Sequence, residues 1–381
     1  MHLYFVAAEP SGDVLASEVI QKISITHPDT SFSGVGGSQM ASLGITSLFD
    51  TKELAVFGLL EGIKAFKTVK ARVEDTARDI VQKNPDAIVL VDSWGFMWRV
   101  AQRAKELGYA GKRIKLIGPQ VWATRAGRAK TLAAHVDHLL CIHDFEEPFY
   151  RPHGLDTTVI GNPALERDSL GNGAAFRKSH ELAEKDTLLL LLLGSRNSEI
   201  KTVAPILIET ANELCKRNSD VKVICVAADS VKDQISELSK TWQFPHALTT
   251  NNDEKLDAFA ACDVALACSG TVTTEVALQN VPLVIGYKVG WVTWAIARLF
   301  LMKAKYITLL NVAAEKEVAK EFIQTRFTTK RLLAALNSLM NSDEARHQQI
   351  EEQNKALEQM GRGGEGASNI SARKIVELAS K

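Results

Sequence analysis

Residues 188–196 read LLLLLLGSR, and residues 3–13 read LYFVAAEPSGD. In each, an apolar run ends in a turn that carries Gly, Ser and a charged side chain. Continuous rather than alternating hydrophobicity is typical of strands buried on both faces, as in a parallel sheet covered by helices. Similar runs recur between helical patterns, at 3–8, 31–37, 87–92, 114–118, 138–143, 157–162, 188–194, 221–228, 263–270 and 282–287. We therefore predict an α/β fold with two Rossmann-like, doubly wound domains.

The weakly patterned stretch 161–180 separates the two series of runs. The predicted segments are an N-terminal Rossmann-like domain at 1–170, a second one at 171–335, and C-terminal helices at 336–381. After Tyr306 we expect helices only, including one over 315–325, a long one over 329–359 and a last one after the turn at 361–368. This outline is typical of nucleotide-sugar glycosyltransferases and of other two-domain α/β enzymes.

Composition narrows the class of protein. The chain has 381 residues, of which 46% are hydrophobic, and 45 Lys and Arg balance 45 Asp and Glu. Disordered and collagen-like chains are excluded, and a neutral total argues against nucleic acid as a partner. There is no signal-peptide pattern, and the longest apolar run is too short to cross a membrane. Five cysteines without a CxxC pattern predict reduced thiols in a cytoplasmic protein.

Loops after the predicted strands of the first half carry candidate catalytic carboxylates, because ligands bind beyond the carboxyl ends of such strands. In AAEPSGD, Ser11 or Gly12 is expected to open a helix whose free amides would suit an anion, with Glu9 and Asp13 beside it. A plain helix cap with acidic first-turn residues explains the same pattern equally well. Asp92 follows another buried strand, and its carboxylate either points into a cleft or caps the next helix.

Two loops of the second half suit a nucleotide diphosphate. Arg196 follows a Gly-Ser turn at a helix start, where backbone donors and a forked guanidinium suit a phosphate. The turn Ser269, Gly270 and Thr271 offers open amides, and Glu275 lies about one helical turn further on, within reach of a ribose diol. A surface arginine near a cap and a purely structural turn are the alternatives. The sequence SGVGG at 33–37 lacks the third glycine of a dinucleotide fingerprint, since position 39 is Gln39.

Basic and apolar islands lie within the neutral total. Residues 99–130 hold nine basic side chains and one acid, and 288–306 hold four basic side chains, several aromatic ones and no acid. The apolar segment 54–66 precedes further basic residues. Together these islands favour an anionic membrane surface or a lipid substrate over core helices with charged outer faces. The expected membrane contacts are Val56, Phe57, Leu59, Leu60 and Ile63.

The chain resembles the lipid-A-disaccharide synthase family. The matching motifs run in family order: AEPSGD (8–13), ELAVFGLLE (53–61), VDSWGF (91–96), PQVWATR (119–125), FEEPFY (145–150), GNP (161–163), LGSR (193–196) and SGTVTTE (269–275). The resemblance implies a GT-B glycosyltransferase that transfers 2,3-diacylglucosamine from its UDP conjugate to 2,3-diacylglucosamine 1-phosphate (lipid X). The implied product is a β(1→6) disaccharide, with inversion and release of UDP, in lipid A biosynthesis.

The resemblance also implies roles for particular residues. Arg196, Ser269, Gly270, Thr271 and Glu275 would hold UDP, and Ser11 and Gly12 would border the reacting sugar. Where members of the family commonly read D-x-P-D-F, this chain has Gly95 in place of the second aspartate. We therefore expect Asp92 to be the general base, with Asp13 and Glu9 as reserves, and we expect no metal or cofactor.

The same resemblance places the enzyme on the cytoplasmic face of the inner membrane of a Gram-negative bacterium. It also implies a homodimer formed through the C-terminal helices. The alternative is a UDP-N-acetylglucosamine 2-epimerase-like enzyme of the same two-domain form, which would need no lipid acceptor.

Overall fold

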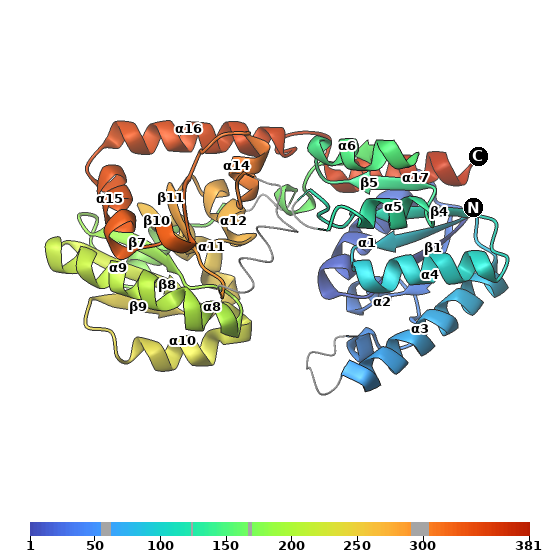
Figure 1. Cartoon of the computed structure of the whole chain (residues 1–381), viewed down its shortest axis with the longest axis horizontal. Coiled ribbons are helices and arrows are strands. Elements are labelled where there is room, and N and C mark those ends of the chain that lie inside the picture. The colour runs from blue at the N-terminus through green and yellow to red at the C-terminus, as the bar shows by residue number, and fades with distance from the viewer. Residues whose placement is uncertain (55–61, 123–124, 167–169, 291–304) are drawn as a thin grey trace. The chain divides into compact units, whose positions relative to one another are not determined.

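The computed structural model describes residues 1–54, 62–122, 125–166, 170–290 and 305–381, the side chains of 62–66 excepted. Contacts divide the chain into two compact units (Figure 1). Unit 1 comprises Met1–Glu166 and Met360–Lys381, and unit 2 comprises Arg167–Gln359. The domain boundaries predicted from the sequence, 1–170, 171–335 and 336–381, remain a prediction.

Unit 1 is built on a six-stranded parallel sheet of order β2-β1-β3-β4-β5-β6. Each of the six runs predicted in the first half overlaps one of its strands. The strands are β1 (His2–Ala7), β2 (Ser31–Val35), β3 (Ala87–Val91), β4 (Lys112–Leu116), β5 (His138–Cys141) and β6 (Asp156–Val159). Its helices are α1 (Pro10–Thr26), α2 (Ser38–Ser42), α3 (Gly62–Lys83), α4 (Trp94–Glu106), α5 (Arg128–Ala133), α6 (Glu147–Tyr150) and α17 (Ala367–Ala379).

Strand β3 shows why the apolar runs are continuous. Successive side chains of a strand point to opposite faces of the sheet. Ile88 and Leu90 enter one core cluster, and Ala87, Val89 and Val91 enter the cluster on the other face. All five are fully buried, so neither face of the strand tolerates a polar side chain.

Unit 2 contains a second six-stranded parallel sheet, of order β12-β11-β10-β7-β8-β9. Four of its strands lie in the predicted runs, and the two at its edges, β9 and β12, do not. The strands are β7 (Thr187–Leu192), β8 (Val221–Val226), β9 (His246–Thr249), β10 (Val264–Cys268), β11 (Leu283–Tyr287) and β12 (Lys320–Ile323).

The predicted helix over 315–325 is wrong, because β12 lies there. An edge strand pairs on one side only and is commonly short and charged, so the sequence KEFI lacks the apolar run that marks an inner strand. Its Glu321 is buried and accepts hydrogen bonds from the backbone amides of Ile307 and Thr308, both at 2.9 Å. The carboxylate therefore serves the adjoining loop rather than the face of a helix.

The helices of unit 2 flank this sheet. The long helix predicted over 329–359 is two helices, α15 and α16, separated at Asn341 and Ser342. The helices are α7 (Gly173–Ser179), α8 (Asn197–Thr202), α9 (Ala204–Arg217), α10 (Lys232–Ser239), α11 (Lys255–Ala260), α12 (Val272–Leu278), α14 (Leu309–Ala313), α15 (Thr329–Met340) and α16 (Asp343–Gln359).

Helix α17 belongs to unit 1, although it follows all of unit 2 in sequence. Ile375 and Val376 are buried in the same core cluster as residues of α1 and β1. At its start, the amide of Ser368 donates to the Glu166 carboxylate at 3.0 Å, and just before it the amide of Asn162 donates to the carbonyl of Met360 at 2.9 Å. The chain therefore leaves unit 1 and returns to it at neighbouring points.

Candidate functional site

The carboxyl edge of the unit 1 sheet brings two predicted carboxylates together. Strands β1 and β3 are hydrogen-bonded neighbours, with Ala7 opposite Val91, so the loops that begin at Ala8 and Asp92 leave the sheet side by side. Glu9 is exposed and is the N-cap residue of α1, which begins at Pro10 rather than at Ser11 or Gly12.

Asp92 lies in a strained turn. Its φ is +49° and that of Ser93 is +32°, a left-handed conformation that costs a non-glycine residue of order 1–3 kcal/mol. Ser93, not Asp92, is the N-cap residue of α4, so the capping alternative is wrong. Within the described part of the chain the Asp92 carboxylate has no hydrogen bond or ion pair. It is therefore available to a substrate.

The side chain of Lys115 is hydrogen-bonded to this turn. The sequence did not identify it as a functional residue. Its side chain is fully buried, and Nζ donates to the carbonyls of Leu90 (3.1 Å), Asp92 (2.5 Å) and Leu116 (3.3 Å). Burial lowers the pKa of Lys115 to about 7, against an opposing effect of the Asp92 and Glu9 carboxylates. The signal that could have revealed it is a lysine between isoleucine and leucine in the otherwise apolar run at 114–118.

Asp13 is committed to the backbone. Its buried carboxylate accepts hydrogen bonds from the amides of Gly37 (2.8 Å), Gln39 (2.8 Å) and Met40 (3.2 Å), which lie at the start of α2. A Cβ on Gly37 would lie 2.7 Å from Asp13 Oδ2, so this glycine is needed for close approach. Asp13 thus caps a helix distant in sequence, not its own.

The other two predicted residues of this loop lie at the start of α1. Ser11 is exposed, and Gly12 is buried against β3. A Cβ on Gly12 would lie 3.5 Å from the Val91 side chain, an ordinary van der Waals contact.

The carboxyl edge of the unit 2 sheet brings the two predicted nucleotide loops together. Strands β7 and β10 are neighbours, with Leu192 opposite Ala267. Gly194 has φ +110°, and a Cβ there would lie 2.7 Å from Glu199 and 3.3 Å from Cys268 Sγ. The loop after β7 is therefore packed against the end of β10.

Arg196 is exposed at this edge, with 73% of its side chain accessible. Its Nη1 donates to Glu199 Oε1 at 3.2 Å, and the amide of Ser195 donates to the other oxygen of the same carboxylate at 2.9 Å. Glu199 is buried and was missed from the sequence. It fixes the loop and holds the guanidinium beside Tyr287.

The turn of Ser269, Gly270 and Thr271 follows β10. Thr271 is the N-cap residue of α12, and a Cβ on Gly270 would meet nothing within 4 Å. Glu275 forms an ion pair with Lys255, a residue that sequence reasoning also missed. Both side chains are about one-third accessible, at 34% and 29%, so this carboxylate lies at the surface of the unit.

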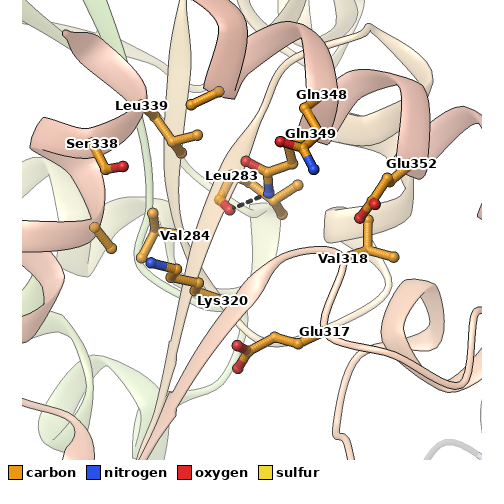
Figure 2. Close-up of a pocket in the computed structure, with 12 residues that line it drawn as sticks. Leu283, Val284, Glu317, Val318, Lys320, Ser338, Leu339, Gln348, Gln349 and Glu352 are labelled. Atoms are coloured by element: carbon orange, nitrogen blue, oxygen red, sulfur yellow. Dashed lines mark hydrogen bonds between the residues drawn. The ribbon is translucent and has the colours of Figure 1, made fainter. Parts of the chain in front are cut away.

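A cavity of 220 Å³ lies elsewhere in unit 2, between α15, α16 and the first residues of β11 and β12 (Figure 2). There Gln349 Nε2 donates to the carbonyl of Leu283 at 2.9 Å. Leu283 and Lys320 begin their strands, so the cavity is at the amino edge of the sheet. Ligands of doubly wound sheets bind at the opposite edge, so we do not assign the donor nucleotide to this cavity.

The predicted membrane contacts do not belong to either of the two carboxyl edges. Val56, Phe57, Leu59 and Leu60 lie outside the described residues, and of Ile63 only the backbone, at the start of α3, is described. No helix in the described ranges is long and apolar enough to cross a membrane. Among these residues no group of three or more His, Cys, Asp or Glu side chains could hold a metal ion.

Two doubly wound α/β units in one chain are the fold of the GT-B class of UDP-sugar enzymes. The chain is similar to MnaA of S. aureus in a co-structure with UDP, with a TM-score of 0.67, 12% identity and coverage of 100% of this chain and 98% of that one. It is also similar to MurG of Acinetobacter baumannii, with a TM-score of 0.60, 16% identity and coverage of 99% of each chain.

Sequence comparison gives the family. The model of the family described as lipid-A-disaccharide synthetase matches residues 3–376. The chain is 38% identical over 381 residues to the lipid-A-disaccharide synthase of Paramagnetospirillum magneticum, covering 99% of this chain and 97% of that one. It is 34% identical to that of Rhodospirillum centenum, covering 100% and 95%. The chain belongs to the lipid-A-disaccharide synthase family and is a glycosyltransferase.

Proposed function

We propose that this enzyme transfers 2,3-diacylglucosamine from its UDP conjugate to the 6-hydroxyl of 2,3-diacylglucosamine 1-phosphate, releasing UDP. The observation that carries the proposal is the family match along nearly the whole chain. The epimerase-like alternative rests on structural likeness at 11–13% identity, which speaks for the fold alone.

The base in this proposal is Asp92. As the acceptor oxygen bonds to the anomeric carbon, the bond from that carbon to the UDP oxygen breaks, and the hydroxyl proton passes to the carboxylate. Three observations support Asp92: its carboxylate has no hydrogen bond or ion pair with any described residue, its turn is strained, and Lys115 fixes that turn through backbone carbonyls. Asp13 is the weaker reserve because both of its oxygens already accept amide hydrogen bonds. Glu9 is exposed and therefore remains the stronger of the two reserve candidates for the base.

The donor nucleotide is assigned to the unit 2 edge. Arg196 would neutralise the diphosphate, and the amides around Gly270 and Thr271 would stabilise the charge that develops on departing UDP. Glu275 would accept hydrogen bonds from the ribose, and Ser269 would border the diphosphate. Ser11 and Gly12 would supply free helix-start amides to the reacting sugar.

Because both substrates carry lipid chains, we expect the enzyme to act at an anionic membrane surface. In this proposal the segment 54–66, with Val56, Phe57, Leu59, Leu60 and Ile63, dips into the cytoplasmic leaflet of the inner membrane of a Gram-negative bacterium. Replacing the apolar residues of this segment by serine should lower co-sedimentation with anionic liposomes. Unchanged co-sedimentation would place these side chains in the core instead.

A homodimer through the C-terminal helices is the remaining expectation. Sedimentation of the purified enzyme in neutral detergent tests it directly. A single species of monomer mass, 41.7 kDa, across micromolar concentrations would exclude the dimer.

The decisive experiment measures UDP release from purified enzyme with both lipid substrates. Asp92→Asn should lower kcat by about 100-fold or more, because it removes proton acceptance and leaves the shape of the turn. Glu9→Gln is the matched control and should retain most activity. Full turnover by Asp92→Asn would remove Asp92 as the base, and UDP-sugar turnover without lipid acceptor would favour the epimerase.

A further inference from the structure

Two arginines of unit 1 lack a counter-charge. Arg128 and Arg125 make no side-chain hydrogen bond or ion pair within the described residues. In the same unit, Arg72, Arg103 and Arg113 each meet a carboxylate at 2.6–2.7 Å. Burial, and after it the charge of Arg125, lowers the pKa of Arg128. The backbone amide of Arg128 donates to the carbonyl of Arg125 at 2.9 Å, so the two residues lie one turn of backbone apart, and an anion would offset their positive charges.

An aromatic ring supports one member of this pair, Arg128. The Arg128 guanidinium carbon lies 5.3 Å from the centre of the Trp94 ring, within cation–π range. Trp94 lies 6.2 Å from Trp98, so the ring belongs to a small aromatic stack on α4. Arg125 has φ +53°, a strained conformation for arginine that the surrounding loop maintains.

The pair is at the same edge of the sheet as the proposed base. Strands β3 and β4 are neighbours with Val91 opposite Leu116. The loop after β3 carries Asp92 and leads to Trp94, and the loop after β4 leads to Arg125 and Arg128. Trp94, two residues beyond Asp92, thus connects the base to the cation pair.

We propose that Arg125 and Arg128, with Trp94 as their support, form a subsite for the phosphomonoester of the acceptor. This inference rests on the proposed function, in which the acceptor carries its phosphate on the same sugar ring as the attacking 6-hydroxyl. Two guanidiniums suit a phosphate dianion because each presents several donors in a planar fork. Binding the phosphate would place the 6-hydroxyl of that ring toward Asp92.

The test compares two acceptors in neutral detergent micelles: 2,3-diacylglucosamine 1-phosphate and the same lipid without phosphate. Arg128→Gln should raise the KM for the phosphorylated acceptor by about 10-fold or more, as expected for loss of a charge-assisted hydrogen bond. The KM for the UDP-sugar and the turnover of the unphosphorylated acceptor should not change. The double variant Arg125→Gln/Arg128→Gln should remove most of the preference for phosphate.

The matched control is Lys130→Gln, which removes one positive charge from the exposed face of the same helix. It should keep the original preference for the phosphorylated acceptor. If Arg128→Gln does not fold, Arg125→Gln changes an exposed side chain and reports on the same preference.

Other outcomes would overturn the subsite. An equal loss with both acceptors, or a raised KM for the UDP-sugar, would place the pair elsewhere in the reaction. Weaker co-sedimentation with anionic liposomes and an unchanged acceptor preference would assign the arginines to phospholipid headgroups. Failure of the unaltered enzyme to use either acceptor would instead contradict the proposed function itself.

Discussion

The two sheets present charge at their carboxyl edges in different ways. In unit 1 two charged groups near this edge are buried and bonded to the backbone: Lys115 to three carbonyls and Asp13 to three amides. In unit 2 the corresponding charges each have a side-chain partner: Arg196 is exposed and pairs with the buried Glu199, and Glu275 is partly exposed and pairs with Lys255.

This difference between the two carboxyl edges predicts how each edge responds when a ligand binds. Groups that are buried and bonded to the backbone fix the geometry of the site before binding. They lose no hydrogen bond when the substrate enters. Exposed ion pairs are individually weak, so a diphosphate or a ribose can replace one partner at little cost. Unit 1 therefore has the features of a preformed catalytic edge, and unit 2 those of an edge that exchanges partners.

The largest expected effect comes from Lys115→Met. Removing the donor common to three carbonyls should let the Asp92 turn relax, and a displacement of about 1 Å lowers rates by about 100-fold. We expect kcat to fall by that amount with the KM of both substrates little changed. Lys112→Met, on the same strand but partly exposed, is the control and should be nearly neutral. If Lys115→Met kept full kcat and changed only stability, Lys115 would be a core residue without a positioning role.

The same residue predicts how stability depends on pH. Burial lowers the Lys115 pKa to about 7 from its ordinary value of 10.5. Between these values the unfolded chain binds a proton that the folded chain does not, so this group favours folding more as the pH rises. In urea unfolding between pH 7 and pH 9, the unaltered enzyme should gain stability relative to Lys115→Met. If the free energies of unfolding of the two proteins changed in parallel with pH, the pKa of Lys115 would have its ordinary value.

Asp13→Ala should act on stability. Three amides at the start of α2 would lose their acceptor, so the free energy of unfolding should fall by about 2 kcal/mol. Urea denaturation measures the change, and Asp29→Ala in an exposed turn should stay within about 0.5 kcal/mol. If Asp13→Asn abolished turnover without loss of stability, Asp13 would be catalytic and the contrast between the edges would need revision.

Arg196→Ala should weaken UDP binding and turnover together. Its guanidinium is exposed, so folding should be unaffected, while UDP affinity should fall by about 10-fold through loss of a charge-assisted contact. Titration calorimetry with UDP measures this, with Lys201→Ala on the same short helix as control. Unchanged affinity would remove Arg196 from the donor site.

The smallest effect is expected for Lys255→Met. Its ion pair with Glu275 is partly exposed, so the free energy of unfolding should change by less than about 1 kcal/mol. Thermal unfolding at low and high salt tests this. A larger loss would mean that unit 2 also depends on a fixed charge network.

The inner strands could be predicted because they are buried on both faces, as the alternating core contacts of β3 illustrate. The edge strands of unit 1, β2 and β6, are also marked by apolar runs, but those of unit 2, β9 and β12, are not, because their short sequences carry no continuous apolar run. KEFI resembles part of an amphipathic helix until its register with β11 is known.

At the candidate site, sequence reasoning reached the loops but not the bonding within them. The local pattern placed Asp13 among the acidic first-turn residues of its own helix, whereas its hydrogen-bond partners lie more than 20 residues away in the sequence. Lys115 was counted as part of a basic stretch, since spacing alone does not reveal that its ammonium group points into the core. Long-range hydrogen bonds of this kind become visible only once the sheet is assembled.

The position of α17 has a consequence for synthesis on the ribosome. Unit 1 needs Ile375 and Val376 to complete one face of its sheet, yet all of unit 2 is translated before them. At about 5–20 residues per second, roughly 10 to 40 s separate the first sheet from its last helix. During that interval the apolar surface of α1 that packs against α17 is uncovered. We therefore expect the N-terminal part of the nascent chain to need chaperone protection for the longest time.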